Sequence, residues 1–358
     1  RDVNMNEKVL MKGNEAIAEA AIAAGCRHFF GYPITPQTEV AAYMSKRMPK
    51  IGGVYLQAES EVASINMVLG AGAAGVRVMT STSSPGISLM AEGISYLAGS
   101  DVPCLIVNVQ RGGPGLGGIQ PSQADYFQAT KSTAHGDFHI LVFAPSTVQE
   151  TVDMIATAFE LGDKYRMPAM VLSDGMLGQM MEPVVLPEAR EPDNDSKDWA
   201  VSGHKDKREH NVVNSLYINP QELETLVKAR FERYAEIKEK HQMAEEYLAD
   251  DADIIIVAYG SSSRVSRSAI DAARKQGIKV GMIRPITLWP FPEKVIEKHV
   301  GHAKAFLSVE MSMGQMVDDV KLVVNGRVPV EFYGRTGGMI PTPNEVLEQI
   351  VRINGGVQ

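Results

Sequence analysis

The feature that most constrains this sequence is the regular alternation of short apolar segments with segments of helical pattern. The alternation runs over residues 12–175, breaks, and resumes over residues 251–353. Strands that alternate with helices in this way are typical of βαβ units on a mostly parallel sheet. The segments 103–109 and 169–172 are apolar throughout, as expected of strands that helices cover on both faces. The sequence therefore predicts an α/β fold with two doubly wound, mostly parallel sheets.

The break in the alternation divides the chain into two predicted domains. The first covers residues 12–180 and the second covers residues 251–358. Residues 181–250 are charged and polar and then show a helical pattern over 221–250, which predicts a linker followed by a long helix. Four residues are expected on the buried side of this helix: Phe231, Tyr234, Ile237 and Met243. We expect residues 1–11 to be disordered and leave open whether they are native.

Charge and cysteine content exclude several classes of protein. The net charge of −8 argues against a generic nucleic-acid or anionic-membrane surface. Cys26 and Cys104 are too few for a disulfide framework or for the four thiolates of a usual iron–sulfur cluster. Uncharged stretches such as 62–76 are shorter than the roughly 18 apolar residues of a membrane span, and no apolar signal core is found near the start. We expect a cytoplasmic protein with no nucleic acid or membrane as a partner.

The loop after the first predicted strand is stiff and carries a hydroxyl group. It consists of Tyr32-Pro33-Ile34-Thr35-Pro36, in which two prolines fix φ and bias the residues before them towards extended backbone. Ligands of open α/β sheets bind beyond the carboxyl ends of the strands. Thr35 is therefore a candidate binding residue, unless it only caps the helix that follows, with Pro36 as the first helical residue.

An acidic loop, Glu59-Ser60-Glu61, comes directly before a helix that is apolar on nearly every side. Acidic residues in a first helical turn commonly do no more than stabilise the helix dipole. Alternatively, the apolar surroundings bury Glu61, and burial favours the neutral form of a carboxyl group. A carboxyl group in that setting can give and take a proton, so Glu61 is a candidate acid–base residue.

A glycine-rich loop covers Arg111–Gly118. Its five glycines let a ligand approach the backbone closely, and its amides can bind an anion. Arg111 can clamp a carboxylate with two hydrogen bonds, although the pattern also fits a flexible loop with a solvated arginine. Gly113, Gly115 and Gly118 match the dinucleotide fingerprint only weakly, because no acidic residue for a ribose follows the next strand.

Three further features allow weaker conclusions. Residues 81–86 are rich in hydroxyl groups and suit either polar ligand contacts or helix capping. Residues 259–263 fit an anion-binding nest or a tight strand-to-helix turn. His299 and His302 form the closest histidine pair, but no thiolate is near them and the nearest acid, Glu297, should lie on another helix face. We therefore expect no metal site in this chain.

Taken in order, these loops resemble the α subunit of the 2-oxoacid:ferredoxin oxidoreductases, a family of thiamine-diphosphate enzymes. The resemblance covers about residues 11–353. Its motifs are Gly31–Pro36, Glu59–Glu61, Ser83–Met90, Arg111–Pro114, Glu310–Gln315, Gly334-Arg335 and Gly337-Gly338. The chain is most similar to the branched-chain type, which acts on 3-methyl-2-oxobutanoate, and next to the 2-oxoglutarate type.

The resemblance implies a role for each domain and for several residues. The first domain would hold the aminopyrimidine of thiamine diphosphate, and the second resembles the transketolase C-terminal domain. Glu61 aligns with the catalytic glutamate that hydrogen-bonds N1′ of the aminopyrimidine and helps the cofactor lose its C2 proton. Thr35 and Arg111 align with residues that bind the substrate near its carboxylate. The implied cofactor-binding residues are Tyr32, Pro33, Ile34, Glu61 and Ser84.

The resemblance also implies partner subunits. The sequence has neither the Gly-Asp-Gly motif for magnesium and diphosphate nor a CxxC motif. In this family, a β subunit carries the magnesium–diphosphate motif, and ferredoxin-like and γ subunits complete the enzyme, with 4Fe–4S clusters on the partners. Coenzyme A takes the acyl group and ferredoxin takes the electrons. Two alternatives remain open: a non-catalytic scaffold subunit with the same fold, and a nicotinamide-dependent oxidoreductase.

Overall fold

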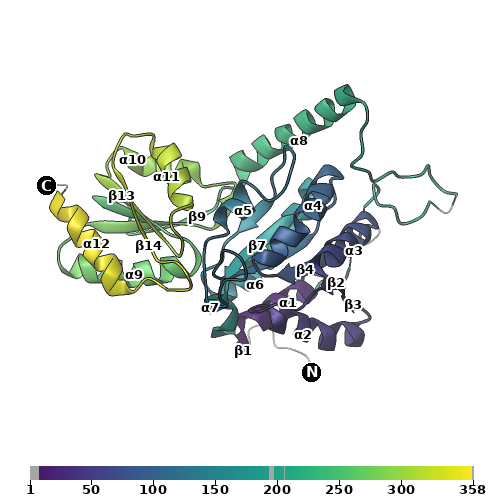
Figure 1. Cartoon of the computed structure of the whole chain (residues 1–358), viewed down its shortest axis with the longest axis horizontal. Helices are drawn as coiled ribbons and strands as arrows, with labels where there is room; N and C mark the ends of the chain where they lie inside the picture. Colours follow the sequence, from purple (N-terminus) through teal and green to yellow (C-terminus); the bar gives the residue numbers. More distant parts are fainter. Residues whose placement is uncertain (1–7, 193–196, 205, 357–358) are drawn as a thin grey trace.

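A computed structural model describes residues 8–192, 197–204 and 206–356, and these fold around two main sheets that lie side by side (Figure 1). The larger sheet has seven strands in the order β12-β6-β7-β5-β4-β2-β3. All its pairings are parallel except that of β12 with β6. Its strands are β2 (His28–Gly31), β3 (Val54–Gln57), β4 (Val78–Thr82), β5 (Leu105–Gln110), β6 (Leu141–Phe143), β7 (Ala169–Asp174) and β12 (Thr287–Trp289).

Helices follow most strands of this sheet and pack against one another in two groups. One group places α3 against α4, and the other places α1 against α2 and α6. The helices of this part are α1 (Gly13–Ala23), α2 (Thr38–Arg47), the 3-10 helix η1 (Met48–Ile51), α3 (Glu61–Ala73), α4 (Pro85–Gly99), α5 (Tyr126–Thr130), α6 (Val148–Tyr165) and α7 (Gly175–Gln179). Strands β4, β5 and β7 are buried along their whole length, which explains why their sequences lack polar alternation.

The smaller sheet has five strands in the order β14-β13-β10-β11-β9, of which only β9 is antiparallel to its neighbour. Its strands are β9 (Ala244–Tyr247), β10 (Ile254–Val257), β11 (Val280–Pro285), β13 (Ala305–Glu310) and β14 (Val330–Gly334). Its helices are α9 (Gly260–Lys275), α10 (Glu293–Val300), α11 (Met316–Val324) and α12 (Pro343–Gly356). The expected fold class, two mostly parallel α/β units, is confirmed.

The long helix predicted over 221–250 is wrong in its second half. Helix α8 (Pro220–Lys240) ends ten residues earlier than Asp250, and residues 244–247 form strand β9 instead. The backbone N–H groups of Ile286 and Thr287 donate to the carbonyl of Met243, which draws this segment into the sheet. Tyr234 and Ile237 are buried as expected, but Phe231 and Met243 are exposed.

The start of the chain also differs from expectation within the described residues. Val9–Lys12 form strand β1, which pairs antiparallel with β8 (Met181–Val184) in a separate two-stranded sheet. The pairing satisfies backbone groups of both segments, so residues 9–11 are ordered. Residues 1–7 lie outside the described part of the chain.

The two main sheets share one hydrophobic core. The larger core cluster runs from Phe29 and Ile106 of the first sheet to Tyr259, Ile283 and Phe306 of the second. Strand β12 comes from the later half of the chain and completes the edge of the first sheet beside β6. None of the helices formed by the described residues is long and apolar enough to cross a membrane.

Candidate functional site

The candidate residues gather at the carboxyl edge of the larger sheet. Strands β3, β2, β4 and β5 are neighbours, and Thr35, Glu61, Ser84 and Arg111 each lie in or just after the loop that leaves one of them. Parallel strands bring their carboxyl ends to one edge of a sheet. The topology therefore collects the four residues into one region, as the sequence predicts.

Glu61 is the first residue of α3 and is buried, with 5% of its surface exposed. The Ser60 side chain caps this helix by accepting a hydrogen bond from the N–H of Ala63 at 3.1 Å. A Cβ atom on Gly86 would lie 3.0 Å from Oε1 of Glu61 and 1.9 Å from Oγ1 of Thr82. Only glycine fits there, so the Glu61 carboxylate closely faces the first turn of α4.

Buried hydroxyl groups without partners lie at the end of β4 and in the loop before α4, and Thr82 among them meets the same Gly86 position as Glu61. Thr80, Thr82 and Ser83 are fully buried, and among the described residues their hydroxyl oxygens have no hydrogen-bond partner. Within the same part of the chain, no hydrogen bond reaches the Glu61 carboxylate. Unpaired buried polar groups are costly, on the order of 1–3 kcal/mol each. Groups of this kind at a strand edge are expected to be satisfied by a polar ligand.

Ser84 is the hub of a buried network between β4 and β5. Its backbone φ is 22°, an uncommon value for a residue other than glycine, and its N–H donates to Oδ1 of Asn108 at 3.0 Å. Its hydroxyl donates to Oδ2 of Asp125 at 2.6 Å and accepts from the N–H of Arg111 at 3.1 Å. Burial raises the pKa of Asp125, although hydrogen bonds from Ser84 and Asn108 oppose this shift. Sequence reasoning missed Asp125.

Arg111 is held rigidly, which excludes the solvated arginine on a flexible loop. Its side chain is buried and donates to the carbonyl of Thr35 at 2.9 Å and to the carbonyl of Leu116 at 3.3 Å. Its Nε has no partner among the described residues. The loop closes on itself through the N–H of Gly118, which donates to the carbonyl of Gly112 at 2.9 Å. The Arg111 guanidinium therefore keeps its Nε–H donor without a partner among the described residues.

The loop after β2 is fixed by Gln37 rather than by a cap at Thr35. Helix α2 begins at Thr38, so Thr35 is not its N-cap residue. The Gln37 amide donates to the carbonyl of Tyr32 at 3.1 Å and accepts from the Ser81 hydroxyl at 2.6 Å. Tyr32 and Thr35 are exposed, whereas Pro33 and Ile34 are partly buried. The exposed Thr35 thus faces the open side of the edge.

A pocket of about 470 Å³ opens beside Thr35. Its lining consists of Thr35, Pro36, Thr38, Glu39, Ile119, Gln120, Pro121, Gly175, Met176, Gln179 and Ile340. Among the described residues that line it, Glu39 alone is ionisable. Burial opposes its charged form, but hydrogen bonds from Gln179 and Asn14 outweigh burial and hold the pKa of Glu39 below its usual value. The pocket is therefore largely apolar, with one negative charge on its wall.

The serine-rich segment 259–263 is a tight strand-to-helix turn rather than an open nest. The Ser261 hydroxyl donates to Oδ2 of Asp174 at 2.6 Å, and the Ser262 hydroxyl donates to Oε1 of Gln123 at 2.6 Å. These groups are buried and join the second sheet to the first. The Ser261 and Ser262 hydroxyls therefore form their hydrogen bonds within the chain.

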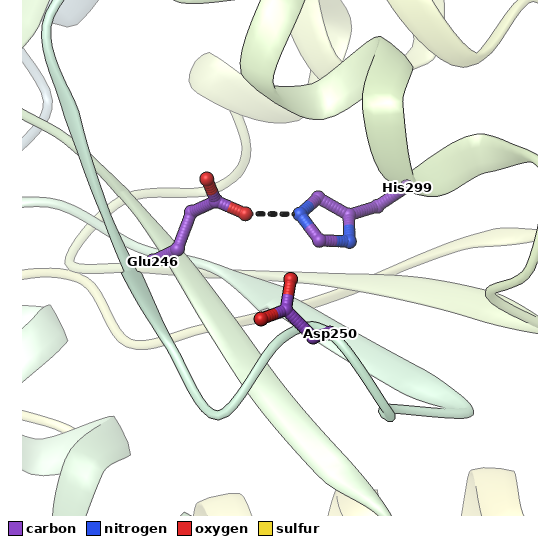
Figure 2. A group of neighbouring side chains, drawn as sticks. All are labelled: Glu246, Asp250 and His299. Carbon is purple, nitrogen blue, oxygen red and sulfur yellow. Dashed lines mark hydrogen bonds and ion pairs between the residues drawn. The ribbon is translucent and has the colours of Figure 1, made fainter.

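His299 contacts acids that sequence reasoning did not anticipate (Figure 2). Its Nε2 hydrogen-bonds the Glu246 carboxylate, and Asp250 lies close enough for the ligand atoms of all three to fall within 4.8 Å of one another. The Lys298 ammonium lies 2.8 Å from Oε2 of Glu246 and 3.4 Å from Oδ1 of Asp250. Lys298 thus supplies a positive charge to both carboxylates, and an ion-pair network accounts for the cluster of Glu246, Asp250 and His299.

Comparison with known families shows that the chain is a subunit of a thiamine-diphosphate-dependent oxidoreductase. Residues 19–250 match the family model described as pyruvate flavodoxin/ferredoxin oxidoreductase, thiamine diphosphate-binding, and residues 252–346 match pyruvate:ferredoxin oxidoreductase core domain II. The chain belongs to the 2-oxoacid:ferredoxin oxidoreductase family. The resemblance seen in the sequence is confirmed.

Curated relatives support the same order of types. The chain is 49% identical to the ketoisovalerate oxidoreductase subunit VorB of Methanothermobacter thermautotrophicus, over 97% of this chain and 98% of the relative. It is 37% identical to the 2-oxoglutarate synthase subunit KorA of Methanothermobacter marburgensis, over 97% of this chain and 99% of the relative. The branched-chain type therefore ranks first, as expected.

Solved structures support the fold. A 2-oxoglutarate:ferredoxin oxidoreductase from Magnetococcus marinus, determined with 2-oxoglutarate, coenzyme A and succinyl-CoA bound, superposes with a TM-score of 0.84 at 28% identity. The match covers 98% of this chain and 66% of that chain. A split-gene transketolase superposes with a TM-score of 0.60 at 13% identity, which supports the fold alone.

Proposed function

We propose that this chain supplies the aminopyrimidine-binding half of a thiamine-diphosphate site, in an enzyme that converts 3-methyl-2-oxobutanoate to acyl-CoA and CO2 and passes electrons to ferredoxin. The observation that carries the proposal is the buried Glu61 carboxylate, which meets Thr82 at the Gly86 position, at a strand edge where the hydroxyls of Thr80, Thr82 and Ser83 are unpaired among the described residues. Within this proposal, residues 12–180 form the aminopyrimidine-binding domain and residues 251–358 the transketolase C-terminal-like domain.

The residues at this edge fit the cofactor. A polar heterocycle would satisfy the unpaired hydroxyls, and Glu61 would exchange a proton with its N1′ atom. Tyr32, Pro33, Ile34 and Ser84 would complete the binding surface. When bound, thiamine diphosphate supplies a carbon nucleophile that attacks 2-oxo groups and accepts the electrons left by decarboxylation.

Arg111 and Thr35 would orient the substrate. The guanidinium retains an unused Nε donor and is anchored through the Thr35 carbonyl, so it presents a fixed positive charge to a carboxylate. The exposed Thr35 lies between this arginine and the 470 Å³ pocket. A 2-oxoacid can therefore place its carboxylate at Arg111 and its side chain in the pocket.

The pocket supports an aliphatic substrate. Pro36, Ile119, Met176 and Ile340 line it, and no basic side chain does. The second carboxylate of 2-oxoglutarate would find no positive partner and would meet the charge of Glu39. A branched aliphatic side chain would instead bury apolar surface there.

The chain would complete its site with a β subunit that carries the magnesium–diphosphate motif. Helix α3 has no charged residue after Glu61 and exposes Val62 and Met67. Helix α4, which packs against α3, exposes Leu89. Exposed apolar surface beside a half-site suits a permanent protein interface. Glu61 begins the same helix, so a β subunit docked on this face would lie next to Glu61.

The two cysteines of this chain support further partner subunits that would hold the iron–sulfur clusters. Cys26 and Cys104 are both buried, and burial raises the pKa of Cys26 to about 12 and that of Cys104 further. Such thiols are poor cluster ligands, so the 4Fe–4S clusters would be held by ferredoxin-like and γ subunits, with coenzyme A as co-substrate. Free buried thiols also suit a reducing cytoplasm.

The test is an anaerobic assay of the native complex with a panel of 2-oxoacids, coenzyme A and a viologen acceptor. We expect 3-methyl-2-oxobutanoate to be the best substrate. Glu61→Gln should lower turnover by far more than tenfold, where tenfold corresponds to a barrier change of about 1.4 kcal/mol. Glu59→Gln, which changes an exposed acid two residues away, should retain full rate.

The outcomes separate the alternatives. A Glu61→Gln enzyme that keeps more than about a tenth of the rate would contradict the assignment. Silent substitutions at Thr35, Glu61 and Arg111 together would indicate a scaffold subunit. Measurable binding of NADH to the purified chain would revive the nicotinamide alternative. A preference for 2-oxoglutarate would keep the reaction class and change the substrate.

A further inference from the structure

We propose that Asp125 is a positioning residue for the 2-oxoacid carboxylate, acting through Ser84 and Arg111. This inference rests on the proposed function, because it concerns the arginine that would bind the substrate. Asp125 directly precedes α5 as its N-cap residue. It does not line the pocket beside Thr35.

Asp125 closes a triangle of hydrogen bonds with Ser84 and Asn108. Its Oδ2 accepts from the Ser84 hydroxyl at 2.6 Å and from the Asn108 amide at 2.9 Å. The Asn108 amide oxygen accepts from the Ser84 N–H at 3.0 Å. Ser84 is thus held from both its backbone and its side chain, in a conformation that an unrestrained serine rarely adopts.

The triangle controls what the Ser84 hydroxyl can do for Arg111. A hydroxyl group has one proton to donate, and here that proton goes to the Asp125 carboxylate at 2.6 Å rather than to the Arg111 carbonyl at 3.3 Å. The lone pairs remain free, and one accepts the N–H of Arg111 at 3.1 Å. Donation to a carboxylate strengthens a hydroxyl as an acceptor, so Asp125 fixes the backbone at the start of the glycine-rich loop.

The same chain of contacts reaches the substrate loop. The Arg111 guanidinium donates to the Thr35 carbonyl at 2.9 Å, so a shift at Arg111 moves both residues that would hold the carboxylate. Among the described residues, Asp125 has no ion-pair partner, and it is bound only by neutral donors. A partly buried carboxylate that only neutral groups bind is costly to keep charged, and its contacts with Ser84 and Asn108 give it a structural role here.

The test is a double-mutant cycle in the assembled enzyme, read as the KM for the 2-oxoacid and as kcat. We expect Asp125→Ala to raise KM by about tenfold with kcat changed less than about threefold. Arg111→Ala should raise KM at least as much. Because Asp125 acts through Arg111, the double variant should show no higher KM than Arg111→Ala alone.

Asp125→Asn is the matched rescue variant. Its amide oxygen can still accept from Ser84 and Asn108, so KM should stay within about threefold of the wild-type value. Ser84→Ala removes the relay without touching Asp125, should give the KM change of Asp125→Ala, and serves as the second variant if Asp125→Ala does not assemble. Asp101→Asn, which weakens a distant pair with Arg230 and Arg233, controls for loss of stability and should leave KM unchanged.

The results distinguish two kinds of failure. Additive KM changes in the double variant, or an Asp125→Asn variant as impaired as Asp125→Ala, would overturn the positioning role while the proposed function stands. An unchanged KM in Arg111→Ala would overturn the proposed substrate role of Arg111, and the inference about Asp125 with it.

Discussion

The two main sheets end in carboxyl edges that treat their polar groups in opposite ways. At the smaller sheet, the buried Glu310 carboxylate accepts hydrogen bonds from the hydroxyls of Ser308 and Ser312 and from three backbone N–H groups at the start of α11. At the larger sheet, Thr80, Thr82 and Ser83 keep unpaired hydroxyls within the described part of the chain. The polar groups at one edge are satisfied within the chain, and these hydroxyls at the other edge are not.

The difference shows that a shared topology does not assign a shared role. Both edges could bind a ligand by the general rule for open α/β sheets. The edge of the smaller sheet instead faces the first, where Gln123 receives the Ser262 hydroxyl and donates to the carbonyl of Tyr259 at 2.8 Å. Polar groups at the edge of the smaller sheet hold the two sheets together, whereas hydroxyl groups at the edge of the larger sheet remain unpaired among the described residues.

Replacing the two buried glutamates should separate stability from activity most strongly. Glu310→Gln should lower the free energy of unfolding by about 3 kcal/mol, because the new amide cannot accept all five hydrogen bonds. Glu61→Gln should change it by less than about 1 kcal/mol, because no hydrogen bond within the described chain is lost. Urea unfolding of both variants measures the difference, and equal losses would remove the distinction between the edges.

Replacing one hydroxyl at each edge should show the same contrast on a smaller scale. Thr82→Val removes an unpaired hydroxyl at nearly constant shape, so stability should hold or rise while cofactor affinity falls about fivefold, or about 1 kcal/mol. Ser261→Ala breaks the bond to Asp174 and should cost about 1 kcal/mol of stability with turnover unchanged. Thermal melts and thiamine-diphosphate titrations check both, and a reversed pattern would contradict the comparison.

Removing the charge on the pocket wall should alter substrate choice slightly. Glu39→Gln should raise kcat/KM for 2-oxoglutarate by about threefold, because the pKa of Glu39 lies below its usual value and its carboxylate is charged at neutral pH. Activity with 3-methyl-2-oxobutanoate should stay within about twofold. The exposed Glu188→Gln is the control, and an unchanged ratio of the two substrates would place the substrate side chain elsewhere.

The last expected effect is confined to acidic pH and concerns His139, which stacks on Trp289 where β12 joins the first sheet. Burial, assisted by Lys238 and Lys131, lowers the pKa of His139 to about 4. In the unfolded chain His139 binds a proton near pH 6.5, whereas in the folded chain it stays neutral until about pH 4. The free energy of unfolding therefore decreases as pH falls from 6.5 towards 4. His139→Phe should reduce that slope in unfolding experiments. An unaltered slope would show that other groups cause it.

Local pattern was sufficient for most of the fold. His28–Gly31 and Val54–Gln57 are strands with the bounds expected from their apolar character. Strands β1, β8, β9 and β12 escaped prediction because their partners lie far along the chain. Residues 244–250 continue the polar pattern of α8, and only pairing with β11 draws 244–247 into a strand.

The site was predictable where a residue's role follows from its own loop. Glu61, Thr35 and Arg111 follow strands, and the structure gathers their loops at one edge. Asp125 and Glu39 were missed because their importance comes from contacts with Ser84, Asn108, Asn14 and Gln179. The Glu246 and His299 contact was missed because it depends on β9.

Strand β12 makes the two halves of this molecule inseparable. It is encoded after the start of the second sheet, yet it closes the edge of the first by pairing with β6. A fragment ending before Thr287 would leave backbone N–H and C=O groups of β6 unpaired at the sheet edge, and exposed edges of this kind promote aggregation. The first half therefore cannot complete its sheet until the chain has been made beyond Trp289. Any gene that divided this chain between its sheets would have to produce fragments that find each other again.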